Sequence, residues 1–237
     1  MRKVLTIAGK ELRSYFVSPM AYAVLLFFLG IAGLIFALSI ASPGAMADMR
    51  GMFQTLVFVS LMMTPILTMG LLSQERASGS IELLMTNPVR DLEVALGKYL
   101  AALGMFLLLC IISLEFPLVL EKYGEPDWGS IGAGYLGLFL CGMSFIAVGL
   151  LASSLTSNQI AAAILGIFML LFFWLIGWLS YSVSQNLGDI VKHVSVYENF
   201  QDFEKGIIDT KPIIFFLSLT GFALFMTVRT LENRRTI

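Results

Sequence analysis

The fold of this chain is organised around 74-QERASGSIELLMTNPVR-90, a polar stretch that lies between two long apolar segments. Within it, Ile81, Leu84 and Met85 are spaced to share one face of a helix. Gly79 or Ser80 can start that helix, and Asn87-Pro88 can stop it. The pattern favours a short amphipathic helix at a membrane surface, although the spacing alone is equally compatible with a solvated loop.

The composition excludes an ordinary soluble domain. Hydrophobic residues make up 58% of the chain and charged residues 13%, whereas soluble domains average about 25% charged residues. The formal net charge is -1 and the chain has no basic run, so nothing indicates a nucleic-acid partner. Cys110 and Cys141 fall inside apolar segments, where cysteines usually serve as small packing residues rather than as disulfide or metal-binding groups.

The charge-free runs predict how many helices cross the membrane. A span needs about 20 apolar residues, and a charge at its centre costs about 2.5–3.5 kcal/mol. The charge-free runs are 14–47, 51–74, 99–114, 128–188 and 212–228. The fourth run is long enough for two spans, and the polar cluster at 153–159 divides it. The sequence therefore predicts an all-α, polytopic membrane protein with six transmembrane helices.

These runs give a single membrane domain, residues 1–237, with the following expected parts. They are an N-terminal interfacial amphipathic helix at 1–18, spans at 20–41, 52–73, 97–120, 129–152, 160–181 and 212–230, the polar segment at 74–90 and an outer loop at 182–211. In the outer loop, Phe200, Phe203, Ile207 and Ile208 recur at helical spacing among charged residues. We therefore expect a surface or re-entrant helix between the fifth and sixth spans.

The basic residues predict which side of the membrane each loop occupies. With six spans both termini lie on one side, and that side carries Arg2, Lys3, Lys10, Arg13, Arg76, Arg90, Lys98, Arg229, Arg234 and Arg235. The other side carries Arg50, Lys122, Lys192, Lys205 and Lys211. The positive-inside rule therefore predicts cytoplasmic termini and a cytoplasmic 74–90 segment.

Glu115 is the one carboxylate that falls within apolar sequence, which makes it a candidate functional residue. The alternative is that Glu115 lies near the outer interface and reaches water. No enzyme motif accompanies it: the chain has no H-E-x-x-H, and its single histidine, His193, lies outside the expected spans. Lys98 follows Gly97 but lacks the other residues of a phosphate-binding loop.

The motif Glu75-Arg76-x-x-Gly79-Ser80-Ile81-Glu82-Leu83-Leu84-x-Thr86-x-Pro88 resembles the cytoplasmic segment between the second and third spans of ABC type-2 exporter permeases. The resemblance implies that this segment forms the coupling helix, which docks on a separate ATP-hydrolysing subunit. The ATPase-coupling residues it implies are Glu75, Arg76, Gly79, Ile81, Glu82, Leu84, Met85 and Pro88.

A second resemblance covers the C-terminal part of the chain. The motif Asn199-Phe200-x-x-Phe203-x-x-Gly206-Ile207-Ile208-Asp209, followed by an apolar span and Leu231-Glu232-Asn233-Arg234-Arg235, is similar to gliding-motility-associated and nitrous-oxide-cluster-type ABC permeases. It implies that the outer loop acts as a gate. The candidate pathway or gate residues are then Glu115, Phe200, Phe203, Gly206 and Asp209.

Together the resemblances imply the transmembrane subunit of an ABC transporter in a bacterial inner membrane. Such a subunit pairs with a second copy or a homologous permease, and an accessory outer-surface protein is a possible further partner. The chain itself is then no enzyme and binds no cofactor, because ATP and magnesium belong to the ATPase subunit. The alternative reading is a membrane scaffold that transmits the ATPase movement to an outer-surface partner without transporting a substrate.

Overall fold

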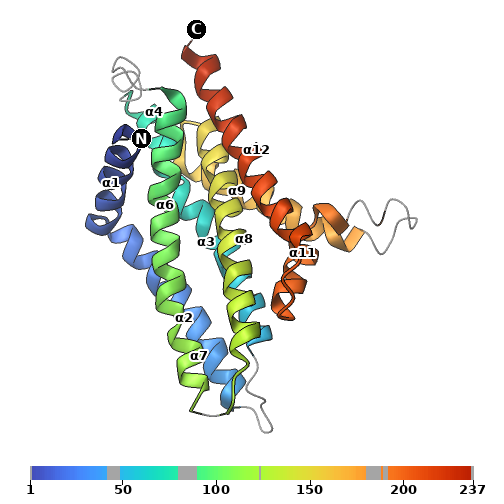
Figure 1. The fold of residues 1–237 in the computed structure, drawn as a ribbon. Coiled ribbons are helices and arrows are strands. Elements are labelled where there is room, and N and C mark those ends of the chain that lie inside the picture. The colour runs from blue at the N-terminus through green and yellow to red at the C-terminus, as the bar shows by residue number, and fades with distance from the viewer. Residues whose placement is uncertain are drawn as a thin grey trace.

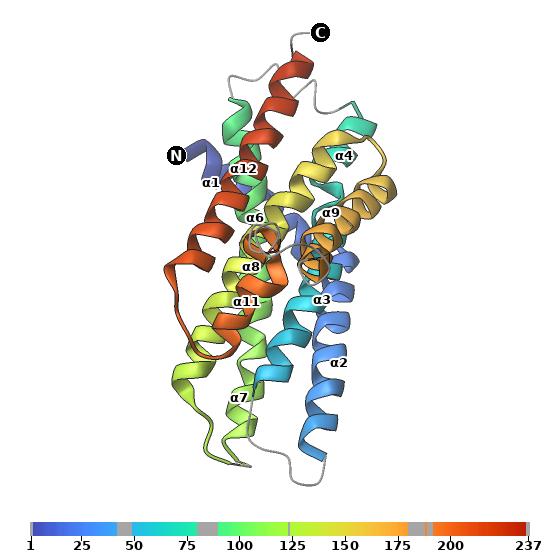
Figure 2. The ribbon, with the colours of Figure 1, turned by 90° about the vertical axis from the view of Figure 1, so that its right-hand side faces the viewer.

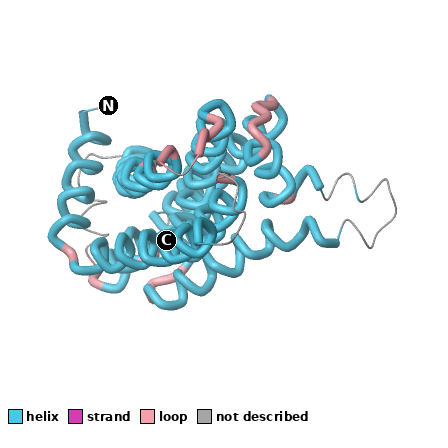
Figure 3. The backbone as a smooth tube through the Cα atoms, turned by 90° about the horizontal axis from the view of Figure 1, so that it is seen from below, coloured by secondary structure: helices cyan, strands magenta, loops and turns pink. Residues whose placement is uncertain are grey.

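The computed structural model describes residues 2–41, 49–79, 90–122, 124–179, 188 and 192–235. The regular elements of these residues are all helices (Figure 3). They are α1 (Arg2–Val17), α2 (Pro19–Ala41), α3 (Arg50–Thr68), α4 (Gly70–Ala77), α6 (Asp91–Ser113), α7 (Glu115–Leu120), α8 (Trp128–Leu155), α9 (Gln159–Leu179), α11 (Val196–Glu204) and α12 (Thr210–Arg235).

Six helical segments are long and apolar enough to cross a membrane. They are Pro19–Ala41, Arg50–Ala77, Asp91–Leu120, Trp128–Leu155, Gln159–Trp178 and Thr210–Asn233. The second consists of α3 and α4, and the third of α6 and α7. The predicted all-α fold with six transmembrane helices is thus confirmed for the described residues.

The two ends of the bundle differ in what they carry. The N-terminus, the C-terminus and α4 lie at one end, called here the terminal end, and α7 lies towards the opposite end (Figure 1). Helix α11 lies well inside the opposite end, at a height between those of α7 and α4 (Figure 2). It is amphipathic and packs against α8, α9 and α12.

Helix α8 is the centre of the bundle, because it contacts α3, α4, α6, α9, α11 and α12. Three of its glycines receive aromatic side chains from three different helices. Phe53 of α3 lies against Gly134, Phe203 of α11 against Gly137, and Phe106 of α6 against Gly142. A Cβ atom on any of these glycines would overlap the facing side chain. Small residues thus let the neighbouring helices approach closely, which is how helices associate in lipid.

The second span is divided into α3 and α4 at Met69, a point called here the break, although the backbone angles of Met69 (φ -53°, ψ -38°) stay helical. Pro65 lies one turn before the break and cannot donate a backbone hydrogen bond. The hydroxyl of Ser153 on α8 donates to the carbonyl of Met69 at 2.8 Å and accepts from the backbone N–H groups of Leu72 and Ser73 at 3.1 Å each. One side chain of α8 therefore satisfies backbone groups on both sides of the break, as a bilayer requires.

Helix α1 lies along the first half of α6 and joins α2 through Ser18. Ile7 of α1 packs on Gly97 of α6, where a Cβ atom would overlap it. On its other sides α1 exposes Leu5, Phe16 and Val17. Its arrangement is that of an amphipathic helix at a membrane interface.

Replacing the α8 glycines tests this packing. Gly142→Ala should lower the free energy of unfolding in detergent by about 1–3 kcal/mol, because the new methyl group meets the buried ring of Phe106. Gly132→Ala is the matched control on the same helix, since nothing lies within 4 Å of the position that its Cβ would occupy. It should leave the unfolding temperature unchanged or raise it slightly, because alanine favours the helix. Equal destabilisation by both substitutions would contradict the packing described.

Candidate coupling site at the terminal end

A buried lysine joins three helices at the terminal end. Lys98 of α6 is 1% exposed. Its Nζ donates to Oε1 of Glu11 on α1 at 2.9 Å and to Oε1 of Glu75 on α4 at 2.8 Å. Both are also ion pairs, and the two glutamate side chains are 17% and 18% exposed. These three residues are called here the Lys98 cluster.

The Lys98 cluster stays together because the buried charge of Lys98 would be strongly destabilising without its two carboxylate partners. A lysine withdrawn from water is stable in its charged form only when carboxylates or carbonyls surround it. Lys98 meets this condition only while α1 and α4 both stay in place, because each supplies one carboxylate. The ion pairs therefore fix the relative positions of α1, α4 and α6.

The Lys98 cluster lies beside the ends of the 80–89 segment. Glu75 is in the last turns of α4, and Lys98 is in the second turn of α6, so their ion pair ties together the two helices that flank this segment. Five of the expected coupling residues, Ile81, Glu82, Leu84, Met85 and Pro88, fall among residues 80–89, which lie outside the described residues.

The other expected coupling residues are placed by α4. Arg76 is half-buried in the last turn of α4, where a cation is favoured by the helix dipole. Gly79 has a φ of 69° and donates from its N–H to the Arg76 carbonyl at 3.2 Å. Glycine is the residue that takes this left-handed conformation without strain, and here it closes α4.

The chain re-enters the described structure at Arg90. The backbone N–H of Arg90 donates to Oε2 of Glu93 at 3.0 Å, so the Glu93 side chain caps the start of α6. The 80–89 segment therefore leaves from a glycine-closed helix end and returns to a capped helix start. Both anchor points have defined backbone geometry.

Tyr15 ties α1 to the break in the second span. Its hydroxyl donates to the carbonyl of Leu67 at 2.9 Å, two residues before the break. Withdrawal from water, assisted by nearby Glu11, raises the pKa of Tyr15 far above its ordinary value. The hydroxyl thus remains a donor at any physiological pH, and α1 contacts both the break and the Lys98 cluster.

The candidate gate residues at the other side of the molecule do not form one group. Glu115 is exposed at the start of α7. Phe200 and Phe203 are buried, and Gly206 has a φ of 81° and lies against Ser130 at the start of α8. Asp209 is half-buried and accepts, through Oδ1, from the N–H of Lys211 at 3.4 Å. Phe203 and Gly206 therefore dock α11 and the turn after it onto α8, while Glu115 lies elsewhere.

A buried carboxylate also holds α11 in place. Glu204 is 9% exposed, and Nε2 of Gln54 on α3 donates to both of its oxygens at 3.0 Å each. Gln54 also lines an apolar groove of about 670 Å³ between α2, α3, α9 and α11. Phe27, Phe58 and Trp174 form part of its walls.

Lys98 and Glu204 are the site residues that sequence reasoning missed. In the sequence, Lys98 looks like an ordinary basic residue that flanks a span. Glu204 looks like one of several charged residues on a short surface helix. Their partners are far along the chain: Glu11 lies 87 positions from Lys98, and Gln54 lies 150 positions from Glu204. Local periodicity carries no signal for such pairs. The one hint is that Lys98 directly precedes the charge-free run 99–114.

Comparison with known proteins gives one match. A family model described as "ABC-2 family transporter protein" matches residues 5–220. This range includes α1, the Lys98 cluster, the 74–90 segment and α11. A comparison with curated proteins found no match.

The Lys98 cluster makes a stability prediction. Lys98→Met should destabilise the chain in detergent by about 1–3 kcal/mol, because two partly buried carboxylates then lose their shared cation. Adding Glu11→Gln and Glu75→Gln to Lys98→Met should recover most of the loss in unfolding temperature. Arg229→Met breaks the exposed ion pair between Arg229 and Glu232, and should have no measurable effect. A triple variant as unstable as Lys98→Met would contradict the electrostatic account.

Proposed function

Because the chain belongs to the ABC-2 family of transporter proteins and is thus a membrane subunit of an ABC transporter, we propose that a separate ATPase subunit drives it through the 74–90 segment. In this proposal ATP and magnesium bind to the ATPase subunit, and this chain binds neither. The permease resembles gliding-motility-associated and nitrous-oxide-cluster-type relatives, and it works as a dimer with a second copy or a homologue.

We propose further that the terminal end faces the cytoplasm of a bacterial cell, with the chain in the inner membrane. The support is the charge distribution, since ten of the fifteen Lys and Arg residues belong to the terminal side. The described ends of the 74–90 segment, namely the last turns of α4 and the start of α6, are on that side as well. An ATPase subunit in the cytoplasm can then reach it.

The observation that carries the proposal is the ion pair between Lys98 and Glu75, which links the two helices that flank the segment. When ATP draws two ATPase subunits together, each coupling segment moves with the surface on which it docks. Because α4 and α6 are tied to each other and to α1, the movement passes to all three helices rather than to a loose loop. The membrane helices then tilt as a unit.

The coupling residues have separate roles in this mechanism. Ile81, Leu84 and Met85 form the apolar anchor on the ATPase surface, and Arg76 and Glu82 set its orientation through charge pairs. The sequence assigned Glu75 to the same charge pairs. Its ion pair with Lys98 instead supports a role inside the chain, where it braces the segment.

The apolar groove between α2, α3, α9 and α11 supports a site for the second copy of the chain. Its walls expose Phe27 at 50% and Phe58 at 45%, and it lies where α11 approaches α3. In a dimer, two such grooves enclose one pathway, and α11 borders it through Tyr197 while Phe203 keeps α11 docked on α8. Glu115 does not line the groove and has no assigned part in this pathway.

Association with the ATPase subunit tests the coupling proposal. Leu84→Asp should abolish co-purification of the ATPase subunit from native membranes, because it places a charge in the apolar anchor, while membrane insertion stays normal. Ile208→Asp is the control: it is a similar change at a 59% exposed position beyond α11, away from the terminal end. It should leave co-purification intact. An intact complex in the Leu84 variant would rule out the proposed anchor.

Cysteine cross-linking tests the dimer face. Phe58→Cys, in the apolar groove, should give a disulfide-linked dimer on mild oxidation in membranes. Phe222→Cys is the control, because Phe222 is 58% exposed on α12, outside the groove. Both native cysteines are buried and should not contribute. A dimer from the α12 variant alone would move the interface to the other side of the bundle.

A further inference from the structure

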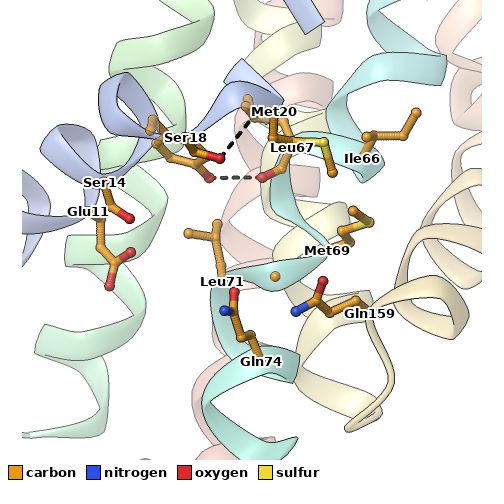
Figure 4. A pocket seen from close by; sticks show the side chains of 12 residues that line it. Glu11, Ser14, Ser18, Met20, Ile66, Leu67, Met69, Leu71, Gln74 and Gln159 are labelled. Atoms are coloured by element: carbon orange, nitrogen blue, oxygen red, sulfur yellow. Dashed lines mark hydrogen bonds between the residues drawn. The ribbon is translucent and has the colours of Figure 1, made fainter. Parts of the chain in front are cut away.

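A polar groove at the terminal end separates α1 from α4 and from the start of α9. It has two adjoining lobes of about 210 and 260 Å³, which share Glu11, Ser14, Gly70, Leu71 and Gln74 as lining residues. The first lobe is shown in Figure 4, where Glu11 and Ser14 face Gln74 and Gln159 from the other side of the space. Of the coupling and gate residues that the structure describes, Glu75 is the one that lines a lobe.

The groove changes from polar to apolar along its length. The second lobe adds Lys10, Glu75 and Lys98, which are all charged. The first lobe instead reaches Met20, Ile66 and Leu67, which belong to the membrane part of α2 and α3. The groove is therefore polar at one end and apolar at the other, in the same order as the headgroup and acyl chains of a phospholipid whose headgroup lies at the terminal end.

Exposed apolar side chains border the groove. Helix α1, which forms one wall, exposes Phe16 at 45% and Val17 at 78%, and Met20 at its junction with α2 is 38% exposed. Such side chains lie in lipid when an amphipathic helix rests at the interface. A phospholipid can thus enter from the side without crossing the bundle.

The charges of the groove match a zwitterion. Lys10 and Lys98 are balanced by Glu11 and Glu75. Among the described residues Lys98 is the one hydrogen-bond donor to Glu11, and it uses only Oε1. The second carboxylate oxygen of Glu11, which lines both lobes, can therefore accept from a cationic ligand group.

We propose that this groove binds the headgroup of a phospholipid that carries a primary ammonium, such as phosphatidylethanolamine. The ammonium donates to Glu11 and to the side-chain carbonyls of Gln74 and Gln159. The phosphate accepts from the hydroxyl of Ser14 and from Lys10. The acyl chains leave along Met20, Ile66 and Leu67.

The lining residues also indicate which lipid headgroups fit the groove less well. A quaternary ammonium is recognised by a cage of aromatic rings. Among the described residues that line the groove there is one aromatic side chain, Tyr15, which lines the first lobe. An anionic headgroup brings a net negative charge next to Glu11 and Glu75. The site therefore favours phosphatidylethanolamine over phosphatidylcholine and phosphatidylglycerol.

A bound lipid would act on the Lys98 cluster, because its ammonium adds a second cation beside Glu11. It would also fill the space between α1 and α4, the two helices that the cluster joins. The proposal concerns binding to this chain alone, so its outcome does not depend on which ATPase subunit or substrate the transporter uses.

Native mass spectrometry of the purified, delipidated chain tests the site. The chain is titrated with phosphatidylethanolamine, phosphatidylcholine and phosphatidylglycerol of identical acyl chains. We expect phosphatidylethanolamine to bind about tenfold more tightly than the other two, which corresponds to about 1.4 kcal/mol. Equal affinity for the three lipids, or a preference for either of the others, would overturn the headgroup assignment.

Two substitutions locate the binding. Ser14→Trp fills the groove from α1, and Gln159→Leu removes an amide from the opposite wall without touching the Lys98 cluster. Each should reduce the affinity for phosphatidylethanolamine about five- to tenfold. Thr6→Trp, at an exposed position of α1 outside the lining, should not. The unfolding temperature of each variant reports its folding, and unchanged affinity in folded Ser14→Trp and Gln159→Leu would overturn the site.

Discussion

The arrangement of the terminal end depends on one buried positive charge. Lys98 is withdrawn from water on α6, and its two carboxylate partners come from α1 and α4. Removing either helix would leave the ammonium under-compensated at a cost of several kcal/mol. The interfacial helix, the end of the second span and the start of the third therefore form one mechanical unit. The 80–89 segment extends from that unit.

Helix α8 connects this unit to the rest of the molecule. At the terminal side, Ser153 binds the backbone on both sides of the break between α3 and α4. Further along the same helix, Gly134 and Gly137 receive Phe53 of α3 and Phe203 of α11. A displacement of α4 is thus transmitted to α8 by hydrogen bonds, and from α8 to α11 by close packing. The hydrogen bonds of Ser153 lie near the terminal end, where other polar groups gather, and the phenylalanine rings lie within the apolar part of the bundle.

The sequence predicted the six spans because long charge-free runs have one physical explanation in a bilayer, where backbone groups must pair within the helix. The 74–90 stretch was recognisable from its motif, because its helical spacing alone was equally compatible with a solvated loop. The Lys98 cluster and the pair of Gln54 and Glu204 could not be predicted, since each joins helices whose side-by-side placement is a property of the folded bundle. For Gly79 the sequence predicted that it or Ser80 starts the helix of the 74–90 stretch, and that helix falls outside the described residues. The structure adds that the positive φ of Gly79 closes α4.

The break at Met69 is the weakest joint on the route between the terminal end and α8. Side-chain hydrogen bonds between membrane helices contribute about 0.6 kcal/mol each on average, whereas the rings seated on Gly134, Gly137 and Gly142 are fixed by close packing that tolerates little displacement. Ser153 and Tyr15 hold the break through hydroxyl groups alone, and hydroxyls can exchange partners without creating a cavity. In the proposed mechanism, a force on α4 therefore first changes the angle between α3 and α4, and the rest of the movement reaches α8 through Ser153. The hydroxyl of Tyr15 makes the turn depend on α1, so the interfacial helix takes part in setting the angle between α3 and α4.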